Sequence, residues 1–425
     1  MLPSRRRLSN GLYRVEGAAK LKVLEGCFYA LGRYFREGDE LIIPKGSVIC
    51  INVRSECVAE GFIAGSIDEA KPEEEVIYVW ESLSNDLTSR KNKIMVIGEP
   101  DSGKTTFSTF LVNTALSKGL KVAFIDADIG QNDIGWPGTI ALALLTQPLS
   151  WLGELESAAI YFVGSNTPNG CEDIVLVGVR KILEKTTSCN LTVINTDGWI
   201  TGKRAILYKA RFVETVNPDA LVVMRGAGSA DCIGKMFEHS GIDVIYAPTP
   251  PKVKCKDKEL RKIRRDLAYL DFLLNSSVKY LKLDKVKFYG TYTLNLQPDS
   301  MLEKFLDSLL GFEVWVESSN SIVVLAVNSE QAYKRALEMR EQLSKTLGKE
   351  VYISNIEGLK GLLVGFLNQK LEHVGVGIIE EVNLSEKVAK VRTPFSIDNV
   401  CLLIPSVLKV TERGLEREKS PFLLA

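Results

Sequence analysis

One short stretch of the sequence has residue types and spacing suited to phosphate chemistry: Gly98-Glu99-Pro100-Asp101-Ser102-Gly103-Lys104-Thr105-Thr106. It fits the pattern of a phosphate-binding loop, or P-loop, which is G-x-x-x-x-G-K-[ST]. The glycines of this pattern let the backbone wrap closely around a phosphate. Lys104 can reach the β- and γ-phosphates as a positive charge, and the Thr105 hydroxyl can bind Mg²⁺. The stretch therefore predicts binding of a nucleoside triphosphate, and it leaves open what is done with the phosphate.

Two acidic side chains follow the next apolar run, in the segment Asp126-Ala127-Asp128-Ile129-Gly130-Gln131. A carboxylate at the end of a strand beside a P-loop can hold Mg²⁺ directly or through water. Asp126 and Asp128 share a face if the strand continues through them, so one could orient the metal while the other accepts a proton. The alternative is an Asp that only caps the next segment. Thr105, Asp126 and Asp128 are the predicted metal-binding residues.

Two later loops carry polar and aromatic side chains. Gly164–Gly170 is rich in hydroxyl and amide groups, although by itself it could be an ordinary turn. Asn195–Gly202 contains Trp199 between glycines, where an aromatic ring could stack on a base. The alternative is a Trp that packs in a core.

A basic segment lies further along the chain. Lys252–Asp266 has eight basic and three acidic residues, which gives a net charge of 8 − 3 = +5. Arg261 and Arg265 are one helical turn apart and project from one face. Such a helix could be a lid that supplies arginines to a transferring phosphoryl group, or a solvated helix face.

These residues require an alternating α/β scaffold to bring them together. From Lys91 onward, apolar strand-like runs alternate with helical segments, which predicts a P-loop core with a doubly wound, mostly parallel sheet. Ligands of such a sheet lie at the carboxyl ends of its strands, which is where the loops above fall. The short alternating runs of residues 1–88 predict a β-sandwich-like domain. Residues 89–285 then form the core with its lid at 252–275, and residues 286–425 form a mixed α/β domain.

Composition excludes several classes of function. The 425 residues contain 53 Lys+Arg and 53 Asp+Glu, so no global field attracts nucleic acid. Two histidines and eight scattered cysteines make a structural zinc site and a His-based catalytic triad poor explanations. With no long apolar run for a membrane span, the expected location is the cytoplasm.

Taken together, these motifs resemble the polynucleotide 5′-hydroxyl kinase family, which includes a pre-mRNA cleavage subunit, a ribosomal-RNA-processing kinase and archaeal relatives. The resemblance rests on Gly98–Thr105, the D-x-D-x-G-Q segment Asp126–Gln131, the clasp-like loop Gly164–Gly170 and the G-W-x-x-G segment within Asn195–Gly202. An archaeal-type member is the closest fit. The chain departs from some relatives by having Asp at position 126 in place of Glu, which leaves open which carboxylate lies nearest the hydroxyl.

The resemblance implies ATP- and Mg²⁺-dependent transfer of a γ-phosphate to the 5′-hydroxyl of RNA, with DNA left open as a second acceptor. It assigns the catalytic roles to Lys104, Asp128, Arg261, Arg264 and Arg265, with Asp128 deprotonating the hydroxyl and the arginines closing over the phosphates. The residues expected to bind nucleic acid are Gln131, Thr167, Pro168, Gly170 and Trp199. Protein partners in RNA processing could dock on the outer domains. The alternative is a non-catalytic, ATP-binding scaffold of such a complex.

Overall fold

The computed structural model describes residues 4–225, 228–250 and 257–417. The chain divides into two compact units. The first comprises the residues up to Tyr161 together with Thr167–Ile263, and the second comprises Phe162–Asn166 and Arg264 onward. The division into three domains at residues 88 and 285 stays a prediction.

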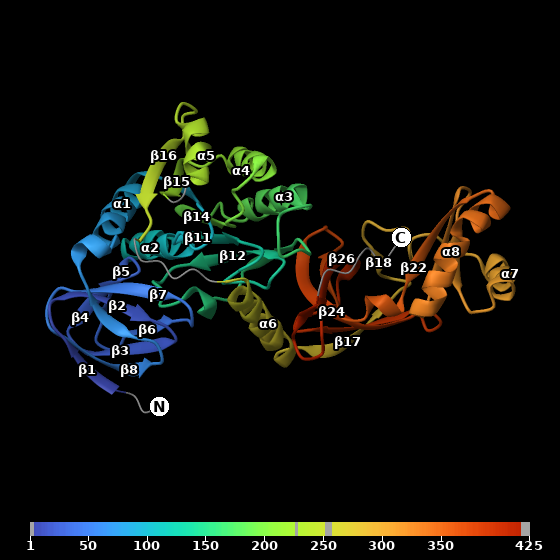
Figure 1. The fold of residues 1–425 in the computed structure, drawn as a ribbon, viewed down its shortest axis with the longest axis horizontal. Helices are drawn as coiled ribbons and strands as arrows, with labels where there is room; N and C mark the ends of the chain where they lie inside the picture. The colour runs from blue at the N-terminus through green and yellow to red at the C-terminus, as the bar shows by residue number, and fades with distance from the viewer. Residues whose placement is uncertain (1–3, 226–227, 251–256, 418–425) are drawn as a thin grey trace. The chain divides into compact units, whose positions relative to one another are not determined.

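Two antiparallel sheets form the N-terminal part of the first unit, drawn in blue in Figure 1. Their inward side chains, such as Val15, Val23 and Phe35, are fully buried and alternate with exposed ones, as expected for sheets with one solvated face. In spatial order the first sheet contains β1 (Ser4–Leu8), β8 (Cys57–Ile63), β3 (Ala19–Glu25) and β6 (Glu40–Ile43). The second contains β5 (Arg33–Arg36), β4 (Cys27–Ala30), β7 (Val48–Val53), β2 (Gly11–Glu16) and β9 (Ile67–Ala70).

The central sheet confirms the predicted fold class. Its spatial order is β13 (Ala159–Phe162), β12 (Thr139–Leu145), β11 (Val122–Ala127), β14 (Leu191–Thr196), β10 (Lys93–Ile97), β15 (Ala220–Arg225) and β16 (Asp243–Pro248). From β11 to β16 every neighbouring pair is parallel, whereas β12 runs antiparallel to β11. Strand β10 reads Lys-Ile-Met-Val-Ile, and its four apolar residues are fully buried because helices cover both faces.

Helices lie on both faces of this sheet (Figure 1). Helices α1 (Ile77–Arg90) and α2 (Lys104–Ser117) pack together on one face. Helices α3 (Glu172–Leu183), α4 (Lys203–Val216) and α5 (Ser229–Phe237) pack side by side on the other. Helix α6 (Lys258–Leu274) follows the sheet. The helix α1 and the antiparallel strand β12 were not expected from the sequence.

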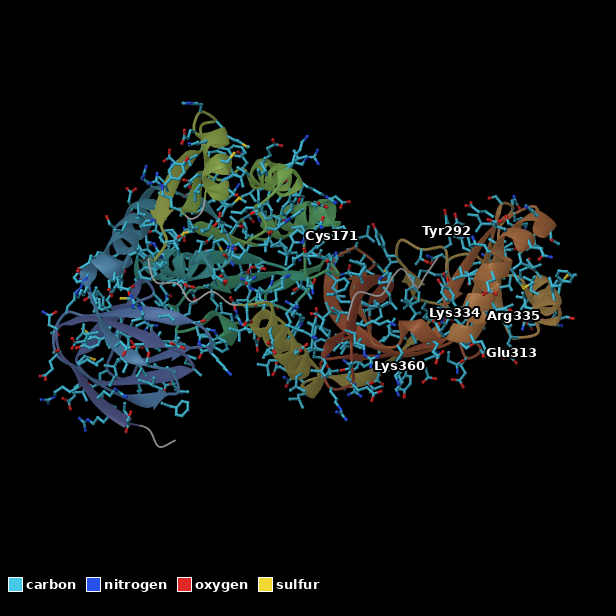
Figure 2. All side chains as sticks on the ribbon, viewed as in Figure 1. Cys171, Tyr292, Glu313, Lys334, Arg335 and Lys360 are labelled. Carbon is cyan, nitrogen blue, oxygen red and sulfur yellow. The ribbon has the colours of Figure 1, made fainter. Side chains whose placement is uncertain are left out.

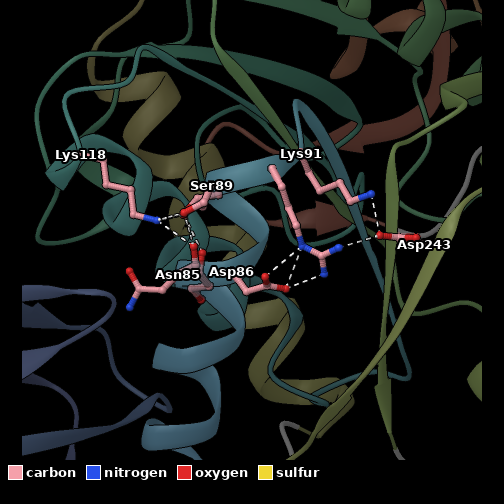
Figure 3. Close-up of polar contacts among 9 residues, drawn as sticks. Asn85, Asp86, Ser89, Lys91, Lys118 and Asp243 are labelled. Atoms are coloured by element: carbon pink, nitrogen blue, oxygen red, sulfur yellow. Dashed lines mark hydrogen bonds and ion pairs between the residues drawn. The ribbon is translucent and has the colours of Figure 1, made fainter.

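The end of α1 is tied to the sheet and to α2 by charged side chains (Figure 3). Arg90 and Lys91 bind the Asp243 carboxylate on β16, at 3.2 and 2.6 Å. The Lys118 ammonium, directly after α2, donates to three oxygens near the end of α1: Asn85 O, Thr88 Oγ1 and Ser89 Oγ. These partly exposed pairs contribute little to stability, because solvent screens their charges. The larger stabilisation comes from Trp80, which is buried against Phe107 and Phe110 of α2.

The second unit contains two further sheets. One orders β17 (Ser277–Lys282), β25 (Val388–Thr393), β24 (His373–Asn383), β23 (Leu362–Asn368), β26 (Val400–Val410) and β18 (Lys287–Phe288), with β27 (Glu416–Arg417) paired to β26. The other orders β19 (Gln297–Pro298), β20 (Trp315–Ser318), β21 (Ile322–Val327) and β22 (Glu350–Asn355). Helices α7 (Ser300–Leu310) and α8 (Glu330–Leu347) share an apolar core with the second of these sheets, through Leu306, Leu310 and Ala336.

Among the helices that the structure describes, none combines the length and the apolar character needed to cross a membrane.

Candidate phosphate- and metal-binding site

The P-loop connects the end of β10 to the start of α2 through a tight turn. Asp101 and Gly103 adopt positive φ angles of 60° and 91°, and Gly103 is the residue that precedes the helix. At Gly98 a Cβ would lie 2.6 Å from Ser102 Oγ and 2.8 Å from Met224 Cβ, so only glycine fits there without displacement. The loop backbone is therefore folded closely over the N-terminus of α2, where helix N–H groups can bind an anion.

Lys104 is the first residue of α2, and only 6% of its surface is exposed. Its ammonium donates to the Glu99 carbonyl oxygen at 2.7 Å, which folds the side chain back over the loop. Burial lowers the pKa of Lys104 to about 8, while the nearby Asp128 charge opposes this shift. A buried cation at this place is positioned to meet phosphate oxygens.

Asn195, at the end of β14, joins the P-loop to the acidic strand end. Its Nδ2 donates to Thr105 Oγ1 at 3.3 Å and to Asp126 Oδ1 at 3.1 Å. The other oxygen of Asp126 accepts from the Asp133 N–H at 2.7 Å. Burial, with the nearby Asp133 and Asp128 charges, holds the pKa of Asp126 well above its usual range. Thr105 and Asp126 are therefore brought together, although no role had been predicted for Asn195 individually.

Three buried polar atoms around this cluster accept and donate no hydrogen bond within the described protein: Ser102 Oγ, Asn195 Oδ1 and Gln131 Oε1. Such atoms are rare in folded proteins and indicate water, an ion or a ligand. A hydroxyl and a carboxylate are typical protein ligands of Mg²⁺, which also keeps waters and phosphate oxygens. Thr105 and Asp126 therefore fit a magnesium ion, and the unpaired Asn195 Oδ1 beside them fits one of its waters.

Asp128 lies just beyond β11 and is only partly exposed. Its Oδ1 accepts from the backbone N–H groups of Gly130 and Gln131, at 3.1 and 3.0 Å. Burial and the charge of Asp197 raise the pKa of Asp128, and Lys104 counteracts them. Asp126 and Asp128 thus differ in environment, because Asp126 is fully buried, whereas Asp128 is partly exposed and lies near the charges of Lys104 and Asp197.

A buried ion pair lies beside these residues. The Lys209 ammonium, on α4, binds Asp197 Oδ2 at 2.7 Å, and both residues are buried. The Tyr208 hydroxyl donates to the same oxygen at 3.0 Å, and the backbone N–H of Trp199 donates to Asp197 Oδ1 at 2.9 Å. The half-buried Trp199 ring lies 5.6 Å from that of Tyr208. Sequence reasoning missed Asp197, Tyr208 and Lys209; the available signal was a lysine on the apolar stripe of α4.

The loop before α3 contains three of the residues predicted to bind nucleic acid. Cys171, labelled in Figure 2, donates its thiol to Thr167 O and its N–H to Pro168 O. Gly170, with a φ of 96°, donates its N–H to Glu172 Oε2 at 3.0 Å. Arg204 at the start of α4 binds the same carboxylate. The loop is therefore fastened to α3 and α4.

Helix α6 brings one of the three predicted lid arginines to the P-loop. Arg261 binds Asp101 Oδ2 at 2.6 Å, and Gln131 Nε2 donates to Arg261 O at 3.2 Å. Arg264 is half-buried on the next turn. Arg265 belongs to the second unit, where Glu416 binds it at 2.7 and 3.3 Å. The basic residues predicted at 252, 254 and 256 lie outside the described residues.

Comparisons with known proteins agree with this fold. Residues 98–275 match the family model of the mRNA cleavage and polyadenylation factor CLP1 P-loop. The chain is also similar in fold to a solved Clp1p in complex with Pcf11p, with a TM-score of 0.63 over 96% of this chain and 98% of that one. Their sequence identity is 13%, so this likeness shows the fold alone.

Archaeal relatives match most of the chain. A polyribonucleotide 5′-hydroxyl-kinase of Pyrococcus furiosus is 31% identical over 77% of this chain and 90% of its own length. The corresponding kinase of Thermococcus kodakarensis is 29% identical over 76% of this chain and 89% of its own length. Plant and insect CLP1 homologues match shorter parts, such as 46% of this chain for that of Arabidopsis thaliana. The chain therefore belongs to the polyribonucleotide 5′-hydroxyl-kinase family.

Proposed function

We propose that this protein transfers the γ-phosphate of ATP to the 5′-hydroxyl end of RNA, with Mg²⁺ as cofactor. The observation that carries the proposal is one cluster, with Lys104 and Asp126 buried, in which the P-loop lysine, the linked Thr105 and Asp126 side chains and the separate carboxylate of Asp128 lie together. The names of the archaeal relatives support the same activity. Phosphoryl transfer needs positioning and charge neutralisation and no covalent nucleophile, so these residue types suffice.

On the donor side, the backbone N–H groups of residues 98–104, except Pro100, bind the β- and γ-phosphates at the start of α2. Lys104 exchanges its hydrogen bond with the Glu99 carbonyl for one with a phosphate oxygen. The phosphate charge also favours the protonated form of this lysine. Lys104 then stabilises the negative charge on the transferring group.

Thr105 and Asp126 would hold Mg²⁺, and Asn195 holds both side chains in place through its amide. When bound, Mg²⁺ neutralises the phosphate charge and aligns the γ-phosphoryl group with the attacking oxygen. The backbone N–H of Asp133 fixes the second oxygen of Asp126. This arrangement keeps Asp126 in one orientation.

On the acceptor side, Asp128 accepts the proton of the attacking 5′-hydroxyl at Oδ2. Its Oδ1 is already held by the N–H groups of Gly130 and Gln131, which orients the carboxylate. A raised pKa makes Asp128 a better proton acceptor than a free carboxylate. Trp199 stacks on the terminal base, and the loop at Thr167, Pro168 and Gly170, with Gln131, positions the nucleotide.

Arg261 is the lid arginine that this proposal places next to the phosphates. Its contact with Asp101 keeps it at the P-loop, where it can turn toward the γ-phosphate. Arg264 and Arg265 remain proposed lid residues. Protein partners in RNA processing are a further proposal, supported by the solved complex of the structurally similar Clp1p with Pcf11p. The cytoplasmic location stays a prediction.

The test is a kinase assay with γ-labelled ATP and Mg²⁺ on an acceptor panel of RNA and DNA, single- and double-stranded, with 5′-hydroxyl ends. Oligonucleotides that already carry a 5′-phosphate are the acceptor control. Lys104→Ala and Asp128→Ala should each abolish transfer, whereas the exposed-site variant Asp398→Asn should keep it. Absence of label transfer to every 5′-hydroxyl acceptor would overturn the proposal.

A further inference from the structure

The Asp197–Lys209 pair is among the most buried charged groups of the first unit. Lys209 has no exposed surface, Asp197 is 3% exposed, and the two charged atoms are 2.7 Å apart. The Lys209 position lies on the stripe of α4 that also buries Ala205, Phe212 and Val213. An apolar pair of similar volume commonly packs as well as a buried ion pair, so stability alone does not account for the charges.

Every oxygen of the Asp197 carboxylate has an assigned partner. Oδ2 receives hydrogen bonds from Lys209 and Tyr208, both on α4. Oδ1 receives the Trp199 N–H, two residues further along the same loop. The carboxylate therefore couples the backbone at Trp199 to α4 through directional bonds, which an apolar contact does not supply.

The Trp199 ring is supported from the same helix. Its centroid lies 5.6 Å from that of Tyr208, with the planes at 33°. Tyr208 packs in turn against Phe212, which is fully buried. Trp199 is thus held by Asp197 at its backbone and by Tyr208 at its indole ring.

We propose that Asp197, Tyr208 and Lys209 are positioning residues for the acceptor nucleotide, acting through Trp199. The inference rests on the proposed function, in which Trp199 stacks on the terminal base. It goes beyond the proposed function by assigning the orientation of Trp199 to the buried ion pair between Asp197 and Lys209 of α4, outside the phosphate-binding motifs.

Steady-state kinetics of the full chain provides the first test. Lys209→Met removes the charge and keeps most of the volume, and we expect the KM for a 5′-hydroxyl oligoribonucleotide to rise about tenfold, in line with the loss of a base stack. The KM for ATP should change by less than about threefold, because the substitution replaces no P-loop residue and leaves Gly198, which contacts Pro100, unchanged. Arg211→Met, an exposed change on the same helix, is the matched control.

The conservative variant Asp197→Asn keeps an oxygen for the Trp199 N–H and should raise the acceptor KM less than Asp197→Ala does. If Lys209→Met does not fold, the neutral pair Asp197→Asn with Lys209→Met replaces it, since no charge is then left buried alone. Equal rises of both KM values, or a loss of kcat with both KM values unchanged, would overturn the proposal in favour of a general structural role.

Fluorescence tests the same idea without any catalysis. The Trp199 contribution is obtained by subtracting the emission of a parallel Trp199→Phe variant, in both the wild-type and the Lys209→Met background. We expect acrylamide to quench Trp199 more strongly when Lys209 is replaced, and unchanged quenching would overturn the inference. If the wild-type protein lacks kinase activity but Lys209→Met still increases the quenching of Trp199, the proposed function is refuted. The positioning of Trp199 by Lys209 then still stands.

Discussion

Gly198, at the start of the Trp199 loop, lies directly against the P-loop, and this contact gives a sharp prediction. A Cβ at position 198 would lie 2.8 Å from Pro100 N, 2.9 Å from Pro100 Cα and 2.9 Å from Pro100 Cγ. Two of these three atoms belong to the backbone, so no side-chain rotation relieves the overlap. We therefore expect Gly198→Ala to displace the P-loop at Pro100.

The size of the effect follows from the geometry. Carbon atoms normally approach to about 3.5 Å, so Pro100 or the Trp199 loop must move by about 0.6 Å. Overpacking of this kind costs about 1–3 kcal/mol. If the loop must return to its present position to bind the triphosphate, the dissociation constant for ATP rises about 5- to 150-fold.

Isothermal titration calorimetry with ATP and Mg²⁺, without acceptor, measures this change directly. Gly178→Ala, on α3, is the matched control. Its Cβ would lie 2.5 Å from Tyr161 Cδ1 and 2.9 Å from Ile140 Cδ1. It should lower the melting temperature and leave ATP binding unchanged. The reasoning is refuted if Gly198→Ala binds ATP within about twofold of wild type, or if both variants weaken binding equally.

Three further predictions concern the same cluster. Without bound triphosphate, Lys104 has a pKa of about 8, so it loses its proton as the pH rises. Because the triphosphate binds the charged form, calorimetry should show the affinity for ATP falling about tenfold from pH 7 to pH 9. Lys104→Met should abolish this pH dependence. Asn195→Ala removes the amide that bridges Thr105 and Asp126, and we expect about tenfold more Mg²⁺ to be needed for half-maximal activity, with Mn²⁺ binding by electron paramagnetic resonance as the second readout; an unchanged requirement would contradict it. Asp101→Asn breaks the ion pair with Arg261, which should speed amide exchange in the first turn of α6 while changing the free energy of unfolding by less than about 1 kcal/mol; unaltered exchange would count against a holding role for Asp101.

The P-loop and the strands around it were predictable because local sequence determines them. Gly98 and Gly103 are required by a close contact and a positive φ, and the runs that became β10 and β11 are continuous and apolar. The sequence also placed the candidate residues at strand ends. It did not show which atoms meet, because that depends on the order β11-β14-β10, which brings Asn195 beside both Asp126 and Thr105.

Two elements escaped prediction for different physical reasons. Helix α1 begins after Val76, which offers no side-chain cap, and its first turn contains β-branched and aromatic residues that favour strands. Trp80 stabilises it through distant contacts with α2 and the Pro248 carbonyl, and these are tertiary contacts. Lys209 escaped because a lysine on a helix normally reaches solvent, and only the fold shows that Asp197 lies opposite it.

The hairpin of β11 and β12 has a consequence for how the acceptor side is assembled. Because these strands pair antiparallel, the segment 128–138 leaves and re-enters the sheet at neighbouring positions. Asn132 Nδ2 crosslinks its two ends by donating to Asp126 O and Thr139 O, and Gly138 donates to Ile129 O. The entropy cost of closing this loop therefore falls on folding and not on substrate binding. The segment that contains Asp128 is therefore held in shape before substrate binds, by bonds to the ends of β11 and β12 and by the bond from Gln131 to Arg261 O.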